Sequence, residues 1–190
     1  MDIALFNRRL SAFFSIKGVF SLRNIVVMGL MAALTAVLSY TTVYIVPSQK
    51  LVDISYLPGA IVAMLYGPWA ALAFGLVSDT IGYFSNPVGA YFFGYAISRM
   101  VTLFIYACFF YNRPVSLMSA AVARLLVMAV VFFGLNFLWQ SILTGGLAAA
   151  YFTSTRLIIN AVSYPFHVAL TMLAAKPAQK IMPMIHDAPS

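Results

Sequence analysis

The sequence predicts an all-α integral membrane protein, a bundle of six transmembrane helices with both termini in the cytoplasm. Hydrophobic residues make up 63% of the 190 residues and charged residues only 8%, whereas soluble domains carry roughly 25% charged residues. The apolar residues gather into segments of about 20 residues, the length that a helix needs to cross a bilayer. Most basic residues flank these segments, so the net charge of +7 indicates orientation in the membrane rather than binding to nucleic acid.

The N-terminal segment, residues 1–20, is basic and mixed in composition. It has no small-residue cleavage site of the secretory type, and several phenylalanines lie near its basic side chains. We therefore expect a short helix on the inner membrane surface. Residues 21–176 then form the membrane domain, and residues 177–190 form a cytoplasmic tail.

Four spans follow from length and composition alone. They are Asn24–Val46, Phe92–Tyr111, Ser116–Leu143 and Thr155–Ala175. The stretch Leu51–Phe84 is long for one helix and short for two, and the sequence "YGPW" at Tyr66–Trp69 breaks it. If this stretch crosses twice, Arg113 and Lys176 share one side with the basic N-terminal segment. The positive-inside rule favours that arrangement, which gives six spans.

Four charged side chains remain inside the predicted spans. They are Asp79, Arg99, Arg124 and Arg156. An ionised side chain at the centre of a membrane helix costs ~2.5–3.5 kcal/mol on insertion scales, so a partner, a water-filled cavity or a ligand usually offsets it. In the purely structural alternative, Asp79 pairs with one arginine and the others reach lipid headgroups. One carboxylate cannot neutralise three guanidinium groups.

Polar and aromatic side chains recur at helical spacing on three spans. One face carries Tyr95, Arg99, Thr102 and Tyr106, a second carries Asn136, Trp139 and Gln140, and a third carries Arg156, Asn160, Ser163, Tyr164 and His167. Lipid offers these groups no partner, so the three faces should point inward. They predict a pocket for a planar heteroaromatic ligand with anionic groups. Hydrogen bonding between helices is the alternative for the two amides, and a structural role is favoured for the histidine.

Several signatures of other functions are missing from the sequence. It contains no G-x-x-x-x-G-K-[ST], no H-E-x-x-H, no G-x-S-x-G and no cysteine cluster, so we expect no enzyme activity, no cofactor and no metal site. A binding subunit of this kind needs a partner. Small residues on the first span, Gly29, Ala32, Ala33 and Ala36, would let a partner helix approach closely. Packing within the bundle is the alternative.

The chain resembles the substrate-binding (S) components of energy-coupling factor (ECF) vitamin transporters, which are multi-pass proteins of the cell membrane. The resemblance runs from about Ser21 to Ala175. It is carried by the A-x-x-x-A of Ala32 and Ala36, "YLPGAIVAMLYGPWAALAFGLVSD" (Tyr56–Asp79), "NPVGAYFFGYAISRM" (Asn86–Met100), "LNFLWQSILTGG" (Leu135–Gly146) and "TRLIINAVSYPF" (Thr155–Phe166). The last two stretches are similar to the folate-specific branch.

The resemblance implies six helices with a short second one, and a folate pocket open to the outside that is capped by the loop after the first helix. Asn136 and Gln140 would read the pterin edge beside Trp139, and Arg99 or Arg156 would take the glutamate carboxylates. Tyr95, Asn160 and Asp79 complete the candidate substrate-binding residues.

The resemblance also implies partners. A transmembrane coupling subunit would dock on the face of Gly29, Ala32 and Ala36 and would work with two cytoplasmic ATP-binding subunits. Three alternatives remain open. The chain could be an S component for thiamine, riboflavin or pantothenate, a structural or regulatory subunit whose arginines bind anionic membrane lipid, or a membrane enzyme.

Overall fold

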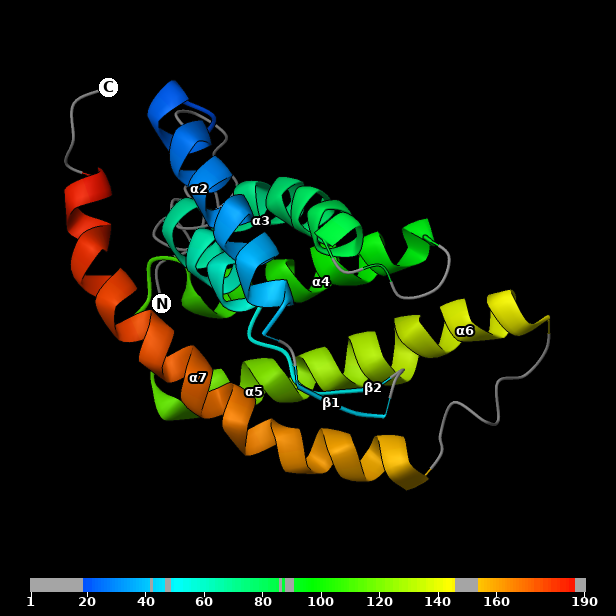
Figure 1. Ribbon diagram of the computed structural model, residues 1–190. Coiled ribbons are helices and arrows are strands. Elements are labelled where there is room, and N and C mark those ends of the chain that lie inside the picture. The colour runs from blue at the N-terminus through cyan, green and yellow to red at the C-terminus, as the bar shows by residue number, and fades with distance from the viewer. Residues whose placement is uncertain are drawn as a thin grey trace, which may run out of the picture.

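The computed structural model describes residues 19–41, 43–46, 49–85, 87, 91–145 and 154–186. Their regular secondary structure is helical apart from one short β-hairpin (Figure 1). The helices are α2 (Leu22–Ser39), α3 (Leu57–Ser85), α4 (Phe93–Phe110), the continuous rod of α5 (Leu117–Val127), η1 (Met128–Asn136) and α6 (Phe137–Thr144), and α7 (Ser154–His186). Five of these helical units are long and apolar enough to cross a membrane, so the predicted helical membrane class is confirmed. Nearly all of the predicted interfacial segment 1–20 lies outside the described residues.

The first helix is shorter than predicted. Ser21 caps its N-terminus by accepting a hydrogen bond from the Asn24 N–H, and the helix ends at Ser39 rather than at Val46. Val43–Val46 instead forms strand β1, which pairs antiparallel with β2 (Gln49–Val52). The prediction failed here because hydropathy does not separate a helix from a strand. The β-branched and aromatic residues of "VYIV" favour the extended chain.

Helix α3 consists of two helices that meet at Gly67, as the "YGPW" breaker predicted. Gly67 has φ 82° and ψ −168°, a conformation that residues with a Cβ rarely adopt. A Cβ there would also lie 3.1 Å from the Tyr111 ring. At 1.5 Å per residue the parts 57–66 and 68–85 are about 15 Å and 27 Å long. Only the second part approaches the ~30 Å thickness of a bilayer.

Helix α3 lies at the centre of the bundle and packs against α2, α4 and α7 (Figure 1). Its contact with α4 is close, because a Cβ on Gly75 would lie 2.7 Å from the Cα atom of Met100. Small residues allow such an approach between membrane helices, where dispersion forces then act over a longer contact. This packing fixes the position of α4, which carries one of the predicted polar faces.

The hairpin leads the chain into the interior. Strand β2 packs beside α7, and the residues that follow it, Ser55 and Tyr56, are buried at 5% and 4% exposure. Helix α7 runs past the predicted end of its span at Ala175 and continues to His186. The segment between the hairpin and α3 thus contacts α4 through Ser55 and α7 through Tyr56.

Candidate functional site

Ser98, Asn136 and Trp139 form a hydrogen-bonded cluster between α4 and the α5–η1–α6 rod. The Ser98 hydroxyl donates to Asn136 Oδ1 over 2.7 Å and accepts from Trp139 Nε1 over 3.1 Å. Ser98 is buried, and the other two residues are half-buried. The single hydroxyl therefore fixes both the indole and the amide. With its oxygen engaged, Asn136 keeps two N–H donors for another acceptor.

Gln140 is held in a similar way one helical turn further on. Its Oε1 accepts a 3.4 Å hydrogen bond from the Tyr95 hydroxyl, so the Gln140 NH₂ group also remains as a donor. Tyr95 and Ser98 lie three residues apart on α4 and share a face. The structure thus brings together five residues, Tyr95, Ser98, Asn136, Trp139 and Gln140, which we call the amide–indole cluster. Both amides present donors rather than acceptors.

Trp139 packs against residues at the start of α4. Its ring lies 5.9 Å from the Phe92 ring in an edge-on arrangement, the geometry that aromatic quadrupoles favour. Gly94 lies against it so closely that a Cβ there would be 2.7 Å from Trp139 Cδ2. The indole therefore has little freedom, and Gly94 is needed for its position.

Asn136 is the last residue of a π-helical segment, η1. A π-turn takes more residues than an α-turn, so it changes the angular position of everything that follows it, and such segments recur at functional sites. Here the change falls between α5 and the residues Trp139 and Gln140. Counting residues at a constant 3.6 per turn cannot reveal this change, although the three predicted residues still face α4 together.

Arg99 contacts the segment that follows the hairpin. One terminal nitrogen of its guanidinium group donates to the Ser55 carbonyl over 2.9 Å. Ser55 is itself bound through its N–H and its hydroxyl to the Asp53 carboxylate. Arg99 thus connects α4 to the predicted cap of the pocket. Its Nε atom is buried and has no hydrogen-bond partner among the described residues.

The polar face of α7 points inward, but its contacts are mainly structural. Ser163 and His167 are buried, and Asn160 and Tyr164 are half-buried. The Tyr164 hydroxyl donates to the Ala121 carbonyl over 2.9 Å, and His167 Nδ1 lies 2.8 Å from the Ser163 carbonyl. These contacts favour the structural role expected for the histidine.

Two further predicted residues are not brought to the amide–indole cluster by any described contact. Asp79 is half-buried in the second part of α3. The backbone of Arg156 belongs to α7, but its side chain lies outside what the structure describes. Within the described residues no group of three or more metal-binding side chains occurs.

The residues of the predicted docking face differ in exposure: some are buried in the bundle and others lie on its surface. Ala32 is 5% exposed and belongs to the core, Ala36 is half-buried, and Gly29 and Ala33 are exposed. A Cβ on Gly29 would meet no atom within 4 Å. Gly29 and Ala33 therefore offer a partner helix the most accessible small residues of this face.

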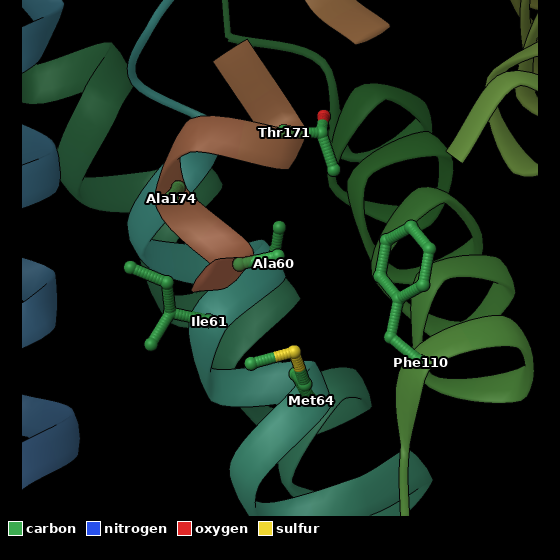
Figure 2. A pocket seen from close by; sticks show the side chains of 7 residues that line it. Ala60, Ile61, Met64, Phe110, Thr171 and Ala174 are labelled. Atoms are coloured by element: carbon green, nitrogen blue, oxygen red, sulfur yellow. The ribbon is translucent and has the colours of Figure 1, made fainter. Parts of the chain in front are cut away.

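A narrow apolar pocket lies away from the amide–indole cluster. Figure 2 shows it between the first part of α3, the end of α4 and α7, where its lining includes Met64, Phe110 and Thr171. Its cavity of about 10 Å³ would hold one water molecule at most. A heteroaromatic ligand does not fit there without movement of the surrounding side chains.

Sequence reasoning missed Ser98, Ser55 and Tyr56. Ser98 lies inside a span, three residues after Tyr95 and directly before Arg99. A small hydroxyl beside a predicted polar face could have indicated a hydrogen bond between helices. Ser55 and Tyr56 lie in a predicted loop, and their sequence gives no sign that the loop enters the bundle.

Comparison with known proteins gives one consistent result. A family model described as the substrate-specific component of ECF transporters matches residues 23–177. The folate transporter FolT of Clostridium novyi (strain NT) is 33% identical over 130 residues, 68% of this chain and 75% of that protein. FolT of Leuconostoc mesenteroides is 27% identical over 154 residues, 78% of this chain and 82% of that protein. A crystal structure of FolT bound with folic acid is similar with a TM-score of 0.73 and 26% identity, covering 83% of this chain and 94% of that one.

Proposed function

This chain belongs to the substrate-specific components of ECF transporters, which are multi-pass membrane proteins and not enzymes, and we propose that it captures folate. The observation that carries the proposal is the match to two FolT proteins and to a FolT structure bound with folic acid. The amide–indole cluster supports it independently, because it combines a held aromatic ring with two oriented amides.

In the proposed complex, the pterin lies against Trp139, and Asn136 and Gln140 donate from their NH₂ groups to ring acceptors. Both amide oxygens are already engaged by Ser98 and Tyr95, which suits an acceptor edge of the pterin rather than a donor edge. Because a desolvated hydrogen bond that is lost costs ~1–3 kcal/mol, two such contacts give useful selectivity for a pterin over other rings.

The glutamate carboxylates of folate then need cationic partners. Arg99 is one candidate, since its Nε is buried and lacks an acceptor within the described part of the chain. Its bond to the Ser55 carbonyl also connects the ligand to the segment after the hairpin. Arg156 is the other candidate, and Asn160 lies one turn from it on α7.

We also propose the six-span topology for the membrane domain 21–176. The two parts of α3, separated at Gly67, would be the short second helix and the third helix. Both termini are then cytoplasmic, and Arg113 lies on the same side. The basic segment 1–20 would rest on the inner membrane surface, and residues 177–190 would face the cytoplasm.

Delivery inward requires energy from partners, because no ATP-binding motif occurs in this sequence. We propose that a transmembrane coupling subunit with two ATP-binding subunits docks on the first helix, around Gly29, Ala33 and Ala36. Exposure of Gly29 and Ala33 supports this face, whereas Ala32 packs inside the bundle.

The proposal is tested by identifying small molecules that copurify with the protein. The full-length chain is purified in a mild detergent from cells supplied with several vitamins, and the bound molecules are released and analysed by mass spectrometry. Folate in near-stoichiometric amount is the expected result. Thiamine, riboflavin or pantothenate in its place would reassign the substrate while keeping the family.

A further inference from the structure

The amide–indole cluster forms only if Asn136, Trp139 and Gln140 lie on the side of the α5–η1–α6 rod that faces α4. The three parts of the rod follow one another without a loop (Figure 1), so the orientation of α6 depends on the winding of η1. This segment has nine residues in π-helical conformation. Most π-helical segments in proteins are single turns, whereas η1 makes about two turns at about 4.4 residues each.

The first part of the rod has a fixed inward face. Ala120, Ala123 and Val127 are buried, and their spacing of three and four residues places them on one side of α5. Helix α5 packs against α4 and α7, and the Tyr164 hydroxyl of α7 donates to the Ala121 carbonyl over 2.9 Å. These contacts oppose any rotation of α5 about its own axis.

The winding of η1 decides which way Asn136 faces relative to this inward face. Asn136 lies nine residues after Val127, at the end of η1. Nine residues make about two and a half turns of an α-helix, which would place Asn136 on the side of the rod opposite Val127. Because a π-turn takes about 4.4 residues, the same nine residues make about two turns and return Asn136 to the side of Val127.

The contacts agree with π-helical winding. Asn136 is half-buried and bonded to α4. Trp139 and Gln140 follow it by three and four residues, share its face and are bonded to α4 as well. The other side of the rod carries Phe133 and Leu138, which are 42% and 48% exposed. With α-helical winding the two amides and the indole would face lipid, where polar groups find no partner.

The sequence of η1 makes this winding easier to adopt. Val130 and Val131 are β-branched and Gly134 is a glycine, and all three residue types have a weaker preference for the α-helix than alanine or leucine. Gly134 is exposed, and a Cβ there would meet only the Ala129 carbonyl, at 3.8 Å. Close packing against another helix therefore does not account for this glycine.

We propose that η1 is the positioning element of the candidate site, because its π-helical winding directs Asn136, Trp139 and Gln140 toward α4. The inference rests on the proposed folate function for the choice of ligand. It has a consequence for the length of η1. Eight residues can still make about two turns if part of the segment winds as an α-helix, whereas ten residues make more than two turns even as a π-helix. The segment should therefore tolerate the loss of one residue but not the addition of one.

The first test compares two single-residue deletions in the full-length protein by isothermal titration with folic acid. Deletion of Gly134 shortens η1, which can absorb the change, so the affinity should stay within roughly threefold of the unmodified value. Deletion of Leu138, an exposed residue of the same rod, changes the angle between Asn136 and Trp139. The affinity should then fall roughly a hundredfold or more. Equal effects in the two variants, or a larger loss on deletion of Gly134, would overturn the proposal.

The second test measures the orientation of Trp139 without a ligand. In a Trp69→Phe background Trp139 is the one remaining tryptophan, and lipids with brominated acyl chains quench a tryptophan that faces them. An alanine inserted after Gly134 should turn the indole away from α4 and increase the quenched fraction of its emission. An alanine inserted after Leu143, beyond the cluster, should leave that fraction unchanged, as should deletion of Gly134.

Unchanged quenching after the insertion in η1 would show that winding does not orient the site, and would refute the proposal. If this insertion prevents folding, the pair of deletions decides alone. Absence of folic acid binding to the unmodified protein would overturn the proposed function instead, and the quenching of Trp139 would still decide the role of η1.

Discussion

Ser98 and Asn136 are joined by a 2.7 Å hydrogen bond that connects α4 to the last residue of the π-helical segment. The same serine accepts the N–H of Trp139. A single buried hydroxyl thus orients an amide and an indole that come from a different helix. In the proposed function, this arrangement prepares the pterin site before the ligand arrives, so that little side-chain ordering remains to oppose binding.

Ser98→Ala should weaken folate binding roughly tenfold, because Asn136 and Trp139 both lose their shared partner at ~1–3 kcal/mol for each unsatisfied group. Titration of the purified variant measures the effect. Ser119→Ala is the control, since that hydroxyl caps α5 together with Ser116 and its loss should cost about 1 kcal/mol of stability at unchanged affinity. Equal affinities in the two variants would remove Ser98 from the site.

Asn136→Ala should weaken folate binding roughly tenfold or more while the protein stays folded, because a ligand acceptor then loses a buried donor. Affinity from titration and circular dichroism of the same sample give the two readouts. An affinity equal to that of the unmodified protein would return Asn136 to a role in helix–helix packing.

Gly94→Ala should displace both the Phe92 ring and the indole of Trp139, since the added Cβ would clash with Phe92 Cε1 and would lie 2.7 Å from Trp139 Cδ2. In a Trp69→Phe background only one tryptophan remains, so its emission reports this ring alone. We expect a shifted emission maximum and weaker quenching by folate. Gly82→Ala, where a Cβ meets no atom within 4 Å, should keep both signals. Full quenching in Gly94→Ala would show that the ring position does not matter.

Gly29→Leu should separate ligand binding from transport. Gly29 is exposed and nothing lies within 4 Å of an added Cβ, so the leucine can extend away from the bundle, where it would hold a partner helix away. Folate affinity in detergent should be unchanged, and ATP-driven uptake into vesicles with the coupling and ATP-binding subunits should be lost. Gly82→Leu, at another open glycine, should retain both. Uptake that persists in Gly29→Leu would move the docking surface elsewhere on the molecule.

Ala32 requires a different experiment. Since it is buried in the core, a bulky substitution there should disturb packing within the bundle as well as docking. Small-residue spacing in the sequence predicts that helices meet at this face, but it cannot separate a contact inside the chain from one with a partner. That distinction depends on how α2 is rotated against α3.

The parts of the fold that follow from hydropathy and breakers were predictable. The spans now seen as α4 and the α5–η1–α6 rod follow from apolar length, and the division of α3 follows from the Gly67–Pro68 pair. The end of α2 was not predictable in this way, because the apolar residues after Ser39 serve a strand as well as a helix.

In the candidate site, too, some residues could be predicted from the sequence and others could not. The amides and Trp139 could be found because lipid makes polar groups costly, so their spacing marks an interior face. Ser98 is too common a residue to be singled out. The burial of Tyr56 depends on where the chain travels after the hairpin, and this is a tertiary property without a local signature.

The central claim, that this S component selects folate, is tested most directly by isothermal titration of the purified full-length protein with folic acid, thiamine and riboflavin under the same conditions. The combination of two oriented amides, a fixed indole and the Arg99 guanidinium group, whose Nε has no acceptor among the described residues, predicts saturable binding of one folic acid per chain. It also predicts affinity at least a hundredfold weaker, about 2.7 kcal/mol, for the other two vitamins. Equal affinities for the three compounds, or no heat with folic acid from a folded and ligand-free sample, would contradict the account.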